Sequence, residues 1–532
     1  MRKTFLALVG VLALAAGVPA SVASGSGATS PDWAHNPRLD EAGDFVARLV
    51  GGEFDNSIFR RSSGTSCQAE PSGTTDVQVN CRAEDDGSPL NTQSETTVAA
   101  FGQKVVVGYN DSLVCCVPSI NLTGYSVSTD GGSTFTDMGD LPSEPGTLPI
   151  GDPTVAHDDA GNFYFATLAL NSIGIGTHSE IAFYEMPAGS NTFHLVSTAV
   201  DVGSEINFFS DKEYLAVAPD GNGQLHFYIS WTFFSRAPSS PIMLTDSTDG
   251  IHWRTTRVSA ADACAQGSTP LPVGGKVFVS WVQQTPAACA SPTGTASNEM
   301  MATFDVNSGT VDRITTVAPV KGNGDKIVAC NRPTDLRQVI ETAPGHDIRN
   351  FELPAITRDS NGTLYMAWND RPDGPGGGNS NATRIFLSFS RDNNVTWSSP
   401  QVISGPVATD HMSDRFQPWL AADATGLHAM WYERVKGTTE DVLRTDKEDL
   451  TLATPASAPV AGAETPISAV TFPVIQTNPN QDPIIANCYM GDYNNIISTG
   501  TTRYVTWGDN RNIVTTSQGV TENQPDVFLA KY

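Results

Sequence analysis

The sequence predicts an all-β protein, a β-propeller of seven blades with about four antiparallel strands in each blade. Two observations predict this fold. Apolar residues alternate, or run for short stretches, between turn residues, and helical periodicity is confined to one short segment at residues 40–50. A strand–turn–strand unit also recurs, starting near residues 95, 152, 213, 268, 352, 417 and 492. Six blades result if the first and last units merge, and a pair of β-sandwiches is the competing architecture.

The N-terminus has the features of an export signal. Arg2 and Lys3 precede a short apolar run at residues 5–16, and small residues follow at 18–23. We therefore expect residues 1–23 to be a cleaved signal peptide and the mature protein to be secreted, with a retained anchor as the alternative. No later apolar stretch is long enough to span a bilayer.

The rest of the chain divides into two parts. Residues 24–93 form an N-terminal segment that is expected to be partly irregular, and residues 94–532 form the propeller. The last unit has room for only three strands before the chain ends. A strand from the N-terminal segment, with residues 75–81 as the candidate, is expected to complete that blade. The longest gap between units, residues 305–349, is expected to be a loop insertion.

Three turns carry a sharper motif, in which a serine is followed by an aspartate two positions later and by an aromatic residue. The motif occurs at Ser128–Asp130–Phe135 and Ser390–Asp392–Trp397, and one residue shorter at Ser247–Asp249–Trp253. In such a turn the aspartate accepts backbone N–H groups, and glycine or asparagine adopts positive φ. The aromatic residue is expected to pack between sheets.

These motifs resemble the Asp box, or BNR repeat, of the sialidase superfamily, and the resemblance covers residues 94–532. It implies that the Asp-box turns lie on the face opposite the active site, so we assign them no chemistry. The chain is not a close match to catalytic sialidases, which carry a Phe/Tyr-Arg-Ile-Pro motif early in the first blade. The matching stretch here begins with Ser94 and Glu95 and contains no arginine.

Charge and cysteine content limit the partners. The formal net charge is −26, with 31 lysines and arginines against 57 acidic residues. Nucleic acid and anionic membranes are bound by clustered cations, so both are excluded as partners. We expect a monomer that binds a glycan or glycoconjugate.

The eight cysteines of an exported chain predict disulfides rather than metal thiolates, and no CxxC pair is present. The local candidate pairs are Cys67–Cys81 and Cys264–Cys289. A further pair, Cys330–Cys488, is also compatible with the sequence. Cys115 and Cys116 are adjacent, and either bridge each other or have distant partners.

The resemblance also predicts where a site would lie. In this family the start of the innermost strand and the end of the second strand of each blade meet on one face, around the central channel. Candidate acid/base residues at strand starts are Glu352, Asp492, Glu95 and Asp152. Close carboxylates raise one another's pKa or recruit a cation. The alternative is that each carboxylate caps a turn or pairs with a neighbouring arginine.

A sialidase binds the carboxylate of its substrate with three arginines and uses a Tyr–Glu nucleophile pair with an aspartate as acid/base. The candidate substrate-binding residues here are Arg371, Arg511, Arg415, Glu213 and Tyr493, with Arg434 as a further arginine. Internal salt bridges at Asp370–Arg371 and Asp509–Arg511 are the alternative.

The function predicted from these features is a secreted, sialidase-like, glycan-processing glycoside hydrolase acting on an acidic sugar. The alternative is a non-catalytic propeller that binds a glycan, a cell-wall polymer or a protein. No cofactor is expected. The metal ligands, if any, are unknown, with a structural divalent cation such as calcium as the alternative.

Overall fold

The computed structural model contains the 532-residue chain. It describes residues 32–35, 41–50, 66–85, 87–88, 90–113, 120–144, 146–171, 177–205, 207–284, 297–322, 326–330, 336–343, 346–372, 382–405, 413–435, 442–474, 482, 484–485, 488–515, 519 and 521–532. The predicted signal peptide lies outside these residues.

The fold is all-β and consists largely of four-stranded antiparallel sheets, each with a strand from one repeat unit at its inner edge. The first sheet consists of β3 (Gln93–Phe101), β4 (Lys104–Asp111), β5 (Thr123–Ser128) and β6 (Thr136–Asp140), with β1 (Cys67–Gln68) added beside β6. The second consists of β7 (Thr147–His157), β8 (Phe163–Asn171), β9 (His178–Met186) and β10 (His194–Ser204). The third consists of β11 (Phe208–Pro219), β12 (Leu225–Ser235), β13 (Ile242–Ser247) and β14 (Arg254–Arg257). The fourth and fifth are β15 (Cys264–Val273), β16 (Lys276–Gln284), β17 (Ser297–Asp305) and β18 (Thr310–Val320); and β22 (Ala355–Arg358), β23 (Leu364–Asp370), β24 (Arg384–Ser390) and β25 (Gln401–Val402).

The C-terminal part adds two more sheets of this kind. They are β26 (Arg415–Ala422), β27 (Leu427–Val435), β28 (Val442–Leu450) and β29 (Thr465–Pro466) with β30 (Phe472–Pro473); and β31 (Asn495–Thr499), β32 (Thr502–Thr515), β33 (Thr521–Lys531) and β2 (Val77–Gln78). In the last sheet, β2 from the N-terminal segment pairs with β33, with Val77 opposite Leu529.

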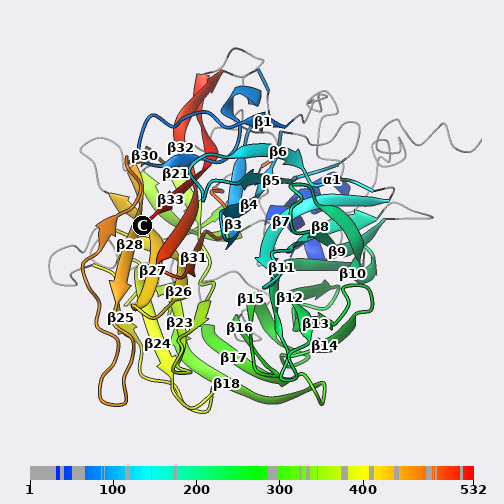
Figure 1. Ribbon diagram of the computed structural model, residues 1–532, viewed down its shortest axis with the longest axis vertical. Helices are drawn as coiled ribbons and strands as arrows, with labels where there is room; N and C mark the ends of the chain where they lie inside the picture. The colour runs from blue at the N-terminus through cyan, green and yellow to red at the C-terminus, as the bar shows by residue number, and fades with distance from the viewer. Residues whose placement is uncertain are drawn as a thin grey trace, which may run out of the picture.

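The innermost strands contact one another around a common centre. The contacts join β3 to β7, β7 to β11, β11 to β15, β15 to β22, β22 to β26, β26 to β31, and β31 back to β3. Figure 1 shows the sheets following one another in chain order, with β32 and β33 returning beside β3. Buried apolar side chains fill the space between neighbouring sheets, for example Ile181 and Phe183 of the second sheet against Phe227 of the third.

Residues 305–349 were expected to be a loop insertion, and this expectation is wrong. They contain β18 and a separate three-stranded antiparallel sheet of β19 (Lys326–Ala329), β20 (Leu336–Ala343) and β21 (His346–Arg349). The reason is visible in the sequence, because Val328, Val339 and Ile340 belong to short apolar stretches that can pair as strands. Cys330 and Cys488 form a disulfide with a Cα–Cα distance of 5.7 Å, which fixes this sheet to the segment before β31.

A second disulfide joins Cys67 and Cys81, as predicted, with a Cα–Cα distance of 6.3 Å. Cys264 is also disulfide-bonded. Its predicted partner Cys289, like Cys115 and Cys116, lies outside the described residues.

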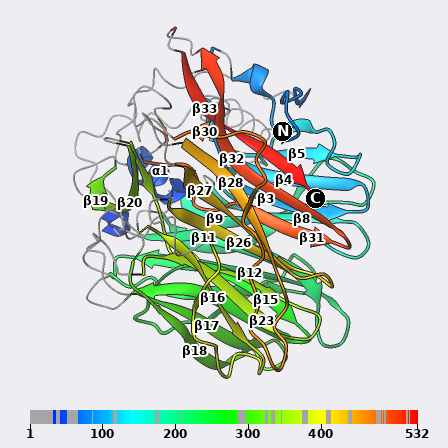
Figure 2. The ribbon, with the colours of Figure 1, turned by 90° about the vertical axis from the view of Figure 1, so that its left-hand side faces the viewer.

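The helix expected at residues 40–50 is α1 (Glu41–Val50), with the short 3-10 helices η1 (Asp32–His35) and η2 (Arg82–Glu84) in the same N-terminal segment. Its apolar side chains Phe45, Val46 and Ala47 are buried, and it contacts β7 and β11. Trp33 stacks on Phe209 of β11 at 4.7 Å between ring centroids. Viewed from the side, α1, β19 and β20 lie together at one end of the sheets (Figure 2). Among the described residues, no helix combines the length and the apolar character that crossing a membrane requires.

The three serine–aspartate turns join the third and fourth strands of their sheets and have the predicted hydrogen bonds. In the first, Asp130 Oδ1 accepts the backbone N–H groups of Ser133 and Thr134, and Ser128 Oγ accepts that of Gly132. Gly132 has a φ of +75°. The other two turns repeat this arrangement around Asp249 and Asp392. Because each turn follows a third strand, it lies at the opposite end of its sheet from the start of the innermost strand.

Candidate functional site

A β-bulge recurs near the start of five innermost strands. The pairing register shifts at the same place in β3, β7, β11, β15 and β26. The first bulged residue has left-handed backbone in every case: Glu95, Asp152, Lys212, Gly267 and Gln417, with φ values of +52°, +57°, +52°, +66° and +53°. Glycine adopts this conformation freely, whereas other residues lose about 1–2 kcal/mol. Four strands therefore carry a charged or polar side chain where glycine would be more stable.

The bulge also determines which residue of β11 occupies the strand-start position, a point that the apolar pattern of the sequence does not decide. Lys212, not Glu213, occupies in β11 the position that Glu95 and Asp152 occupy in their strands. Glu213 is the next residue and is buried as well.

Hydrogen bonds link three strand starts to one another. Glu95 Oε1 accepts the backbone N–H of Asp492 at 3.0 Å, and Glu95 Oε2 accepts Asn110 Nδ2 at 3.0 Å. The backbone N–H of Asp152 donates to Asn110 Oδ1 at 2.8 Å. Glu95, Asp152 and Asp492 are at most 4% exposed. The structure thus brings three of the four predicted acid/base residues into one connected group, which we call the channel-mouth site.

An arginine that sequence reasoning missed completes this group. Arg349 faces Asp492 with two nitrogens, Nε to Oδ1 at 3.2 Å and Nη2 to Oδ2 at 2.6 Å, and both side chains are buried. Its guanidinium lies 5.0 Å from the centre of the Tyr489 ring. Arg349 is the last residue of β21, so the inserted three-stranded sheet delivers a positive charge to the site. The only signal in the sequence was an arginine three residues before Glu352.

Tyr493 lies among the acidic side chains of the first three sheets. Burial, followed by the negative charges of Glu95, Asp152 and Glu213, raises the pKa of Tyr493 well above its usual value. Its hydroxyl donates to the carbonyl oxygen of Pro153 at 3.1 Å. Lys212 Nζ lies 3.4 Å from the centre of its ring. Tyr493 is therefore a neutral phenol in a strongly anionic setting.

Two aromatic residues follow the bulges of β11 and β26. Tyr214 and Trp419, each two positions further along β11 and β26 than the bulge, stack at 5.1 Å between ring centroids. Asn495 Nδ2 donates to the Tyr214 hydroxyl at 2.8 Å. These contacts join β11, β26 and β31 next to the channel-mouth site. Beside it, a pocket is lined by Asn110, Phe45, Leu122, Ile150 and Ile484, so Asn110 faces both the pocket and Glu95.

Three of the predicted substrate-binding arginines have carboxylate partners within the chain. Arg371 and Arg434 both contact Asp414, at 3.2 and 2.7 Å. Arg371 donates its backbone N–H to Asp370 but ion-pairs with Asp414. Arg415 contacts Glu433 and Glu464, each at 2.9 Å.

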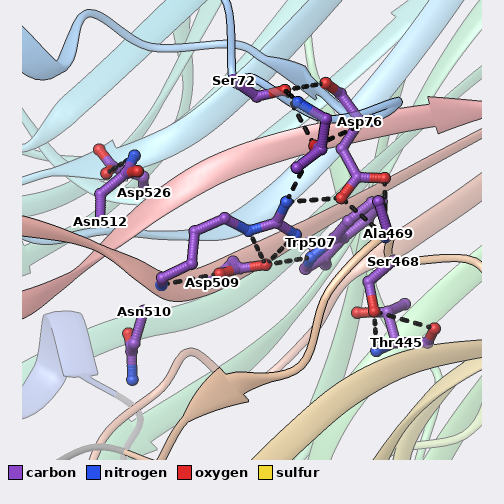
Figure 3. A network of polar contacts seen from close by, with 12 residues as sticks. Ser72, Asp76, Thr445, Ser468, Ala469, Trp507, Asp509, Asn510, Asn512 and Asp526 are labelled. Atoms are coloured by element: carbon purple, nitrogen blue, oxygen red, sulfur yellow. Dashed lines mark hydrogen bonds and ion pairs between the residues drawn. The ribbon is translucent and has the colours of Figure 1, made fainter.

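Arg511 joins the N-terminal segment to the last sheet. Its guanidinium contacts Asp509 at 2.9 Å and Asp76 at 2.6 Å, and Trp507 Nε1 donates to the same Asp509 carboxylate at 3.1 Å (Figure 3). The contacts of Arg511 thus match the salt-bridge alternative stated from the sequence. None of these contacts shows a role in substrate binding for Arg371, Arg415 or Arg511, and that role stays a prediction.

Glu352 lies near a second acidic group, between the fourth and fifth sheets. Glu299 of β17 is fully buried, and neither of its carboxyl oxygens has a hydrogen-bond partner among the described residues. Burial, followed by the charges of Glu352 and Asp370, raises the pKa of Glu299 well above its usual value. Burial also raises the pKa of Asp370 to about 6, against the opposing effect of three backbone N–H donors. Burial therefore favours the neutral form of Glu299, beside a predicted acid/base residue, and no sequence motif marks this position.

Comparisons with known proteins show no match to any protein-family profile. No curated protein matches the sequence either. Solved structures similar to the chain include the α-L-arabinofuranosidase Arb93A from Fusarium graminearum, in complex with an iminosugar inhibitor, at 9% identity and a TM-score of 0.41 over 86% of this chain and 97% of that chain. The Penicillium chrysogenum α-L-arabinanase complexed with arabinobiose has 10% identity and a TM-score of 0.41 over the same shares. A Trypanosoma rangeli sialidase in complex with the inhibitor DANA has 11% identity and a TM-score of 0.38, over 71% of this chain and 59% of that chain. The chain is no close match to any of these enzymes.

Proposed function

We propose that the protein is a glycan-processing glycoside hydrolase whose reaction takes place at the channel-mouth site. The observation that carries the proposal is the use of Glu95, Asp152, Lys212 and Gln417 at left-handed bulge positions. Strained backbone of this kind concentrates at functional sites, where the side chain is needed despite its conformational cost.

The residues of the site divide into roles that glycoside hydrolysis requires. Two carboxyl groups must act as proton donor and as nucleophile or base. Glu95, oriented by two N–H donors, suits the nucleophile or base, and Asp152 suits the proton donor. Asp492 and Arg349 position Glu95 through the Asp492 backbone. Glu352 remains a predicted acid/base residue, since its neighbours Glu299 and Asp370 can hold a proton.

An acidic sugar as substrate is a finer part of the proposal. Arg349 and Lys212 are the cations at the channel mouth, and a substrate carboxylate would bind against them. Glu213 and Tyr493 would contact the neutral part of the sugar. Secretion is supported by the disulfides and by the N-terminal signal sequence. We further propose that the sheets form seven blades of one ring, in view of the unbroken contacts of the innermost strands.

The test is a screen of the purified secreted chain against chromogenic glycosides, including sialosides and α-L-arabinofuranosides. The variants Glu95→Gln and Asp152→Asn should then be assayed on any glycoside that the unaltered chain hydrolyses, and we expect each to lower kcat at least 100-fold. Glu144→Gln is the matched control, because Glu144 is exposed in the segment between β6 and β7. Binding of a glycan without turnover would instead support the non-catalytic alternative, and full activity of both variants would refute the assigned roles.

A further inference from the structure

A histidine and two carboxylates share one face of the second sheet, away from the channel-mouth site. His178 and Glu180 are two residues apart on β9, so their side chains point to the same face. Asp201 on β10 lies directly opposite Glu180 in the antiparallel register. Directly opposed residues have Cβ atoms about 4.5–5.5 Å apart. Two rigid strands therefore hold all three side chains together.

The donor atoms are close enough for one ion to bind all three side chains. His178 Nδ1 lies 3.1 Å from both carboxylate oxygens of Asp201. One ligand atom from each residue, including Glu180, lies within 4.8 Å of the others. Bonds of about 2.0–2.2 Å in a tetrahedral zinc site place ligand atoms about 3.3–3.6 Å apart. Small side-chain rotations are enough to reach that geometry.

The surroundings of the three residues favour an added cation. Glu180 is 2% exposed and accepts hydrogen bonds from Asn171 Nδ2 at 2.8 Å and Thr198 Oγ1 at 3.1 Å. A further carboxylate, Glu205, is also buried; it follows Ser204, which lies opposite His178, and its backbone N–H donates to the Thr177 carbonyl oxygen at 3.1 Å. Its Oε2 atom has no hydrogen-bond partner in the described part of the chain. A buried oxygen of this kind, next to the imidazole, is a ready acceptor for a metal-bound water.

A second carboxylate group in the protein already has cationic side chains beside it. Glu433, Asp446 and Glu464 also come within 4.8 Å of one another. There, Arg415 bridges Glu433 and Glu464, and Arg444 contacts Asp446 at 2.8 Å. Among the described residues, the ion-pair partner of Asp201 is His178, and neither lysine nor arginine pairs with Glu180.

We propose that His178, Glu180 and Asp201 form a binding site for a divalent transition metal, with Zn²⁺ as the ion that fits the donor set. Imidazole nitrogen favours Zn²⁺ over Ca²⁺ or Mg²⁺, which prefer all-oxygen sites. Water completes the coordination. His178 and Asp201 are 43% and 45% exposed, so an ion can enter from solvent. The site does not depend on the proposed hydrolase activity.

The experiment is a titration of the chelator-treated, tag-free chain with ZnCl₂ and CaCl₂, followed by calorimetry and by elemental analysis of bound metal. We expect one Zn²⁺ per chain with micromolar or tighter affinity. His178→Ala and Asp201→Asn should each weaken Zn²⁺ binding at least tenfold. Both side chains are partly exposed, so unchanged melting temperatures without metal will show that the variants are folded.

His194→Ala is the matched control. His194 lies on the same pair of strands and faces Glu185 at 3.7 Å, but among the described residues no third candidate ligand joins this pair. Zn²⁺ binding that survives in this variant and is lost in His178→Ala supports the site. The proposal is overturned if the unaltered chain binds no Zn²⁺, if it binds Ca²⁺ in preference, or if His178→Ala binds Zn²⁺ as well as the unaltered chain does.

Discussion

The two ends of the sheets use carboxylates in opposite ways. At the Asp-box end, hydrogen bonds within the turn outweigh partial burial and lower the pKa of Asp130 and of Asp392 to about 2. At the other end, burial raises the pKa of Asp370 to about 6 and that of Glu299 well above its usual value. The first group is stabilised in the anionic form by the turn, whereas burial makes ionisation of the second group less favourable. Acids of the second kind are those that a reaction can use.

Disulfides provide the largest expected difference between the two ends. Cys330 and Cys488 close a loop with a separation of 158 residues beside the channel-mouth site, and Cys67 and Cys81 close one of 14 beside the first Asp-box turn. In the chain-entropy treatment, removal of the first disulfide lowers the free energy of unfolding by about 5 kcal/mol, and removal of the second lowers it by about 3 kcal/mol. Paired Cys→Ser variants, measured by urea unfolding under oxidising conditions, should show that order.

The same pair of variants separates stability from function. The backbone N–H of Arg349 donates to the carbonyl oxygen of Cys488 at 2.6 Å, so loss of the Cys330–Cys488 bridge should also displace Arg349 and lower activity. Removal of Cys67–Cys81 should leave activity on the substrate unchanged below the melting temperature. Equal activity losses in both variants would contradict the assignment of Arg349 to the site.

Removal of the Arg349 charge should have the next largest effect on the free energy of unfolding. Arg349→Ala leaves Asp492 buried without its cation, which we expect to cost about 3–5 kcal/mol of unfolding free energy. The control is Arg349→Met with Asp492→Asn, where no buried charge remains. The double variant should recover most of the stability and none of the activity. Recovery of activity as well would show that the pair is only structural.

The sequence carried enough information to predict the repeat and the Asp-box turns, and three of the four residues predicted as acid/base candidates lie together at the channel mouth. Glu95, Asp152 and Asp492 were found because each occupies the same place in a repeat unit. Arg349 was missed since it lies in an inserted sheet that has no counterpart in the repeat. In β11 the sequence pointed to Glu213 where the structure has Lys212, because a bulge shifts the register by one residue without altering the apolar pattern.

The arginine partners illustrate a different limit. Arg371 follows Asp370 in the sequence, yet it pairs with Asp414, 43 residues away. Such a choice depends on the packing of β23 against β26, which local spacing does not encode. Glu299 could not be predicted for the same reason, because its burial and raised pKa arise only when two neighbouring sheets pack together.

The pH dependence of stability should differ in sign between the two ends. The pKa of Asp370 is about 6 in the folded protein, above its usual value of 3.8, so the folded state holds a proton that the unfolded state has lost between about pH 4 and 6. Its contribution is greatest below pH 4 and falls as pH rises, by at most about 1.4 kcal/mol per pH unit. Asp370→Asn should remove this fall, as measured by urea unfolding at pH 4 to 7. An unchanged slope would show that Asp370 titrates normally.

Asp130 should produce the smallest effect and the opposite slope. Its folded pKa of about 2 lies below its usual value of 3.8, so its contribution is present above pH 4 and is lost as pH falls from about 4 to 2. Asp130 is largely exposed, and its Oδ1 accepts two backbone N–H groups, so Asp130→Ala should cost only about 1 kcal/mol at pH 7. The difference in urea midpoint between the variant and the unaltered chain should shrink as pH falls toward 2, where the carboxylate is protonated in the unfolded state and about half protonated in the folded state. Asp312→Ala serves as the control for removing a surface carboxylate outside a turn, since Asp312 pairs with the partly exposed Lys276. A loss of activity in Asp130→Ala would contradict the assignment of a purely structural role to the Asp-box end, because a change there would then affect the site at the far end of the sheet.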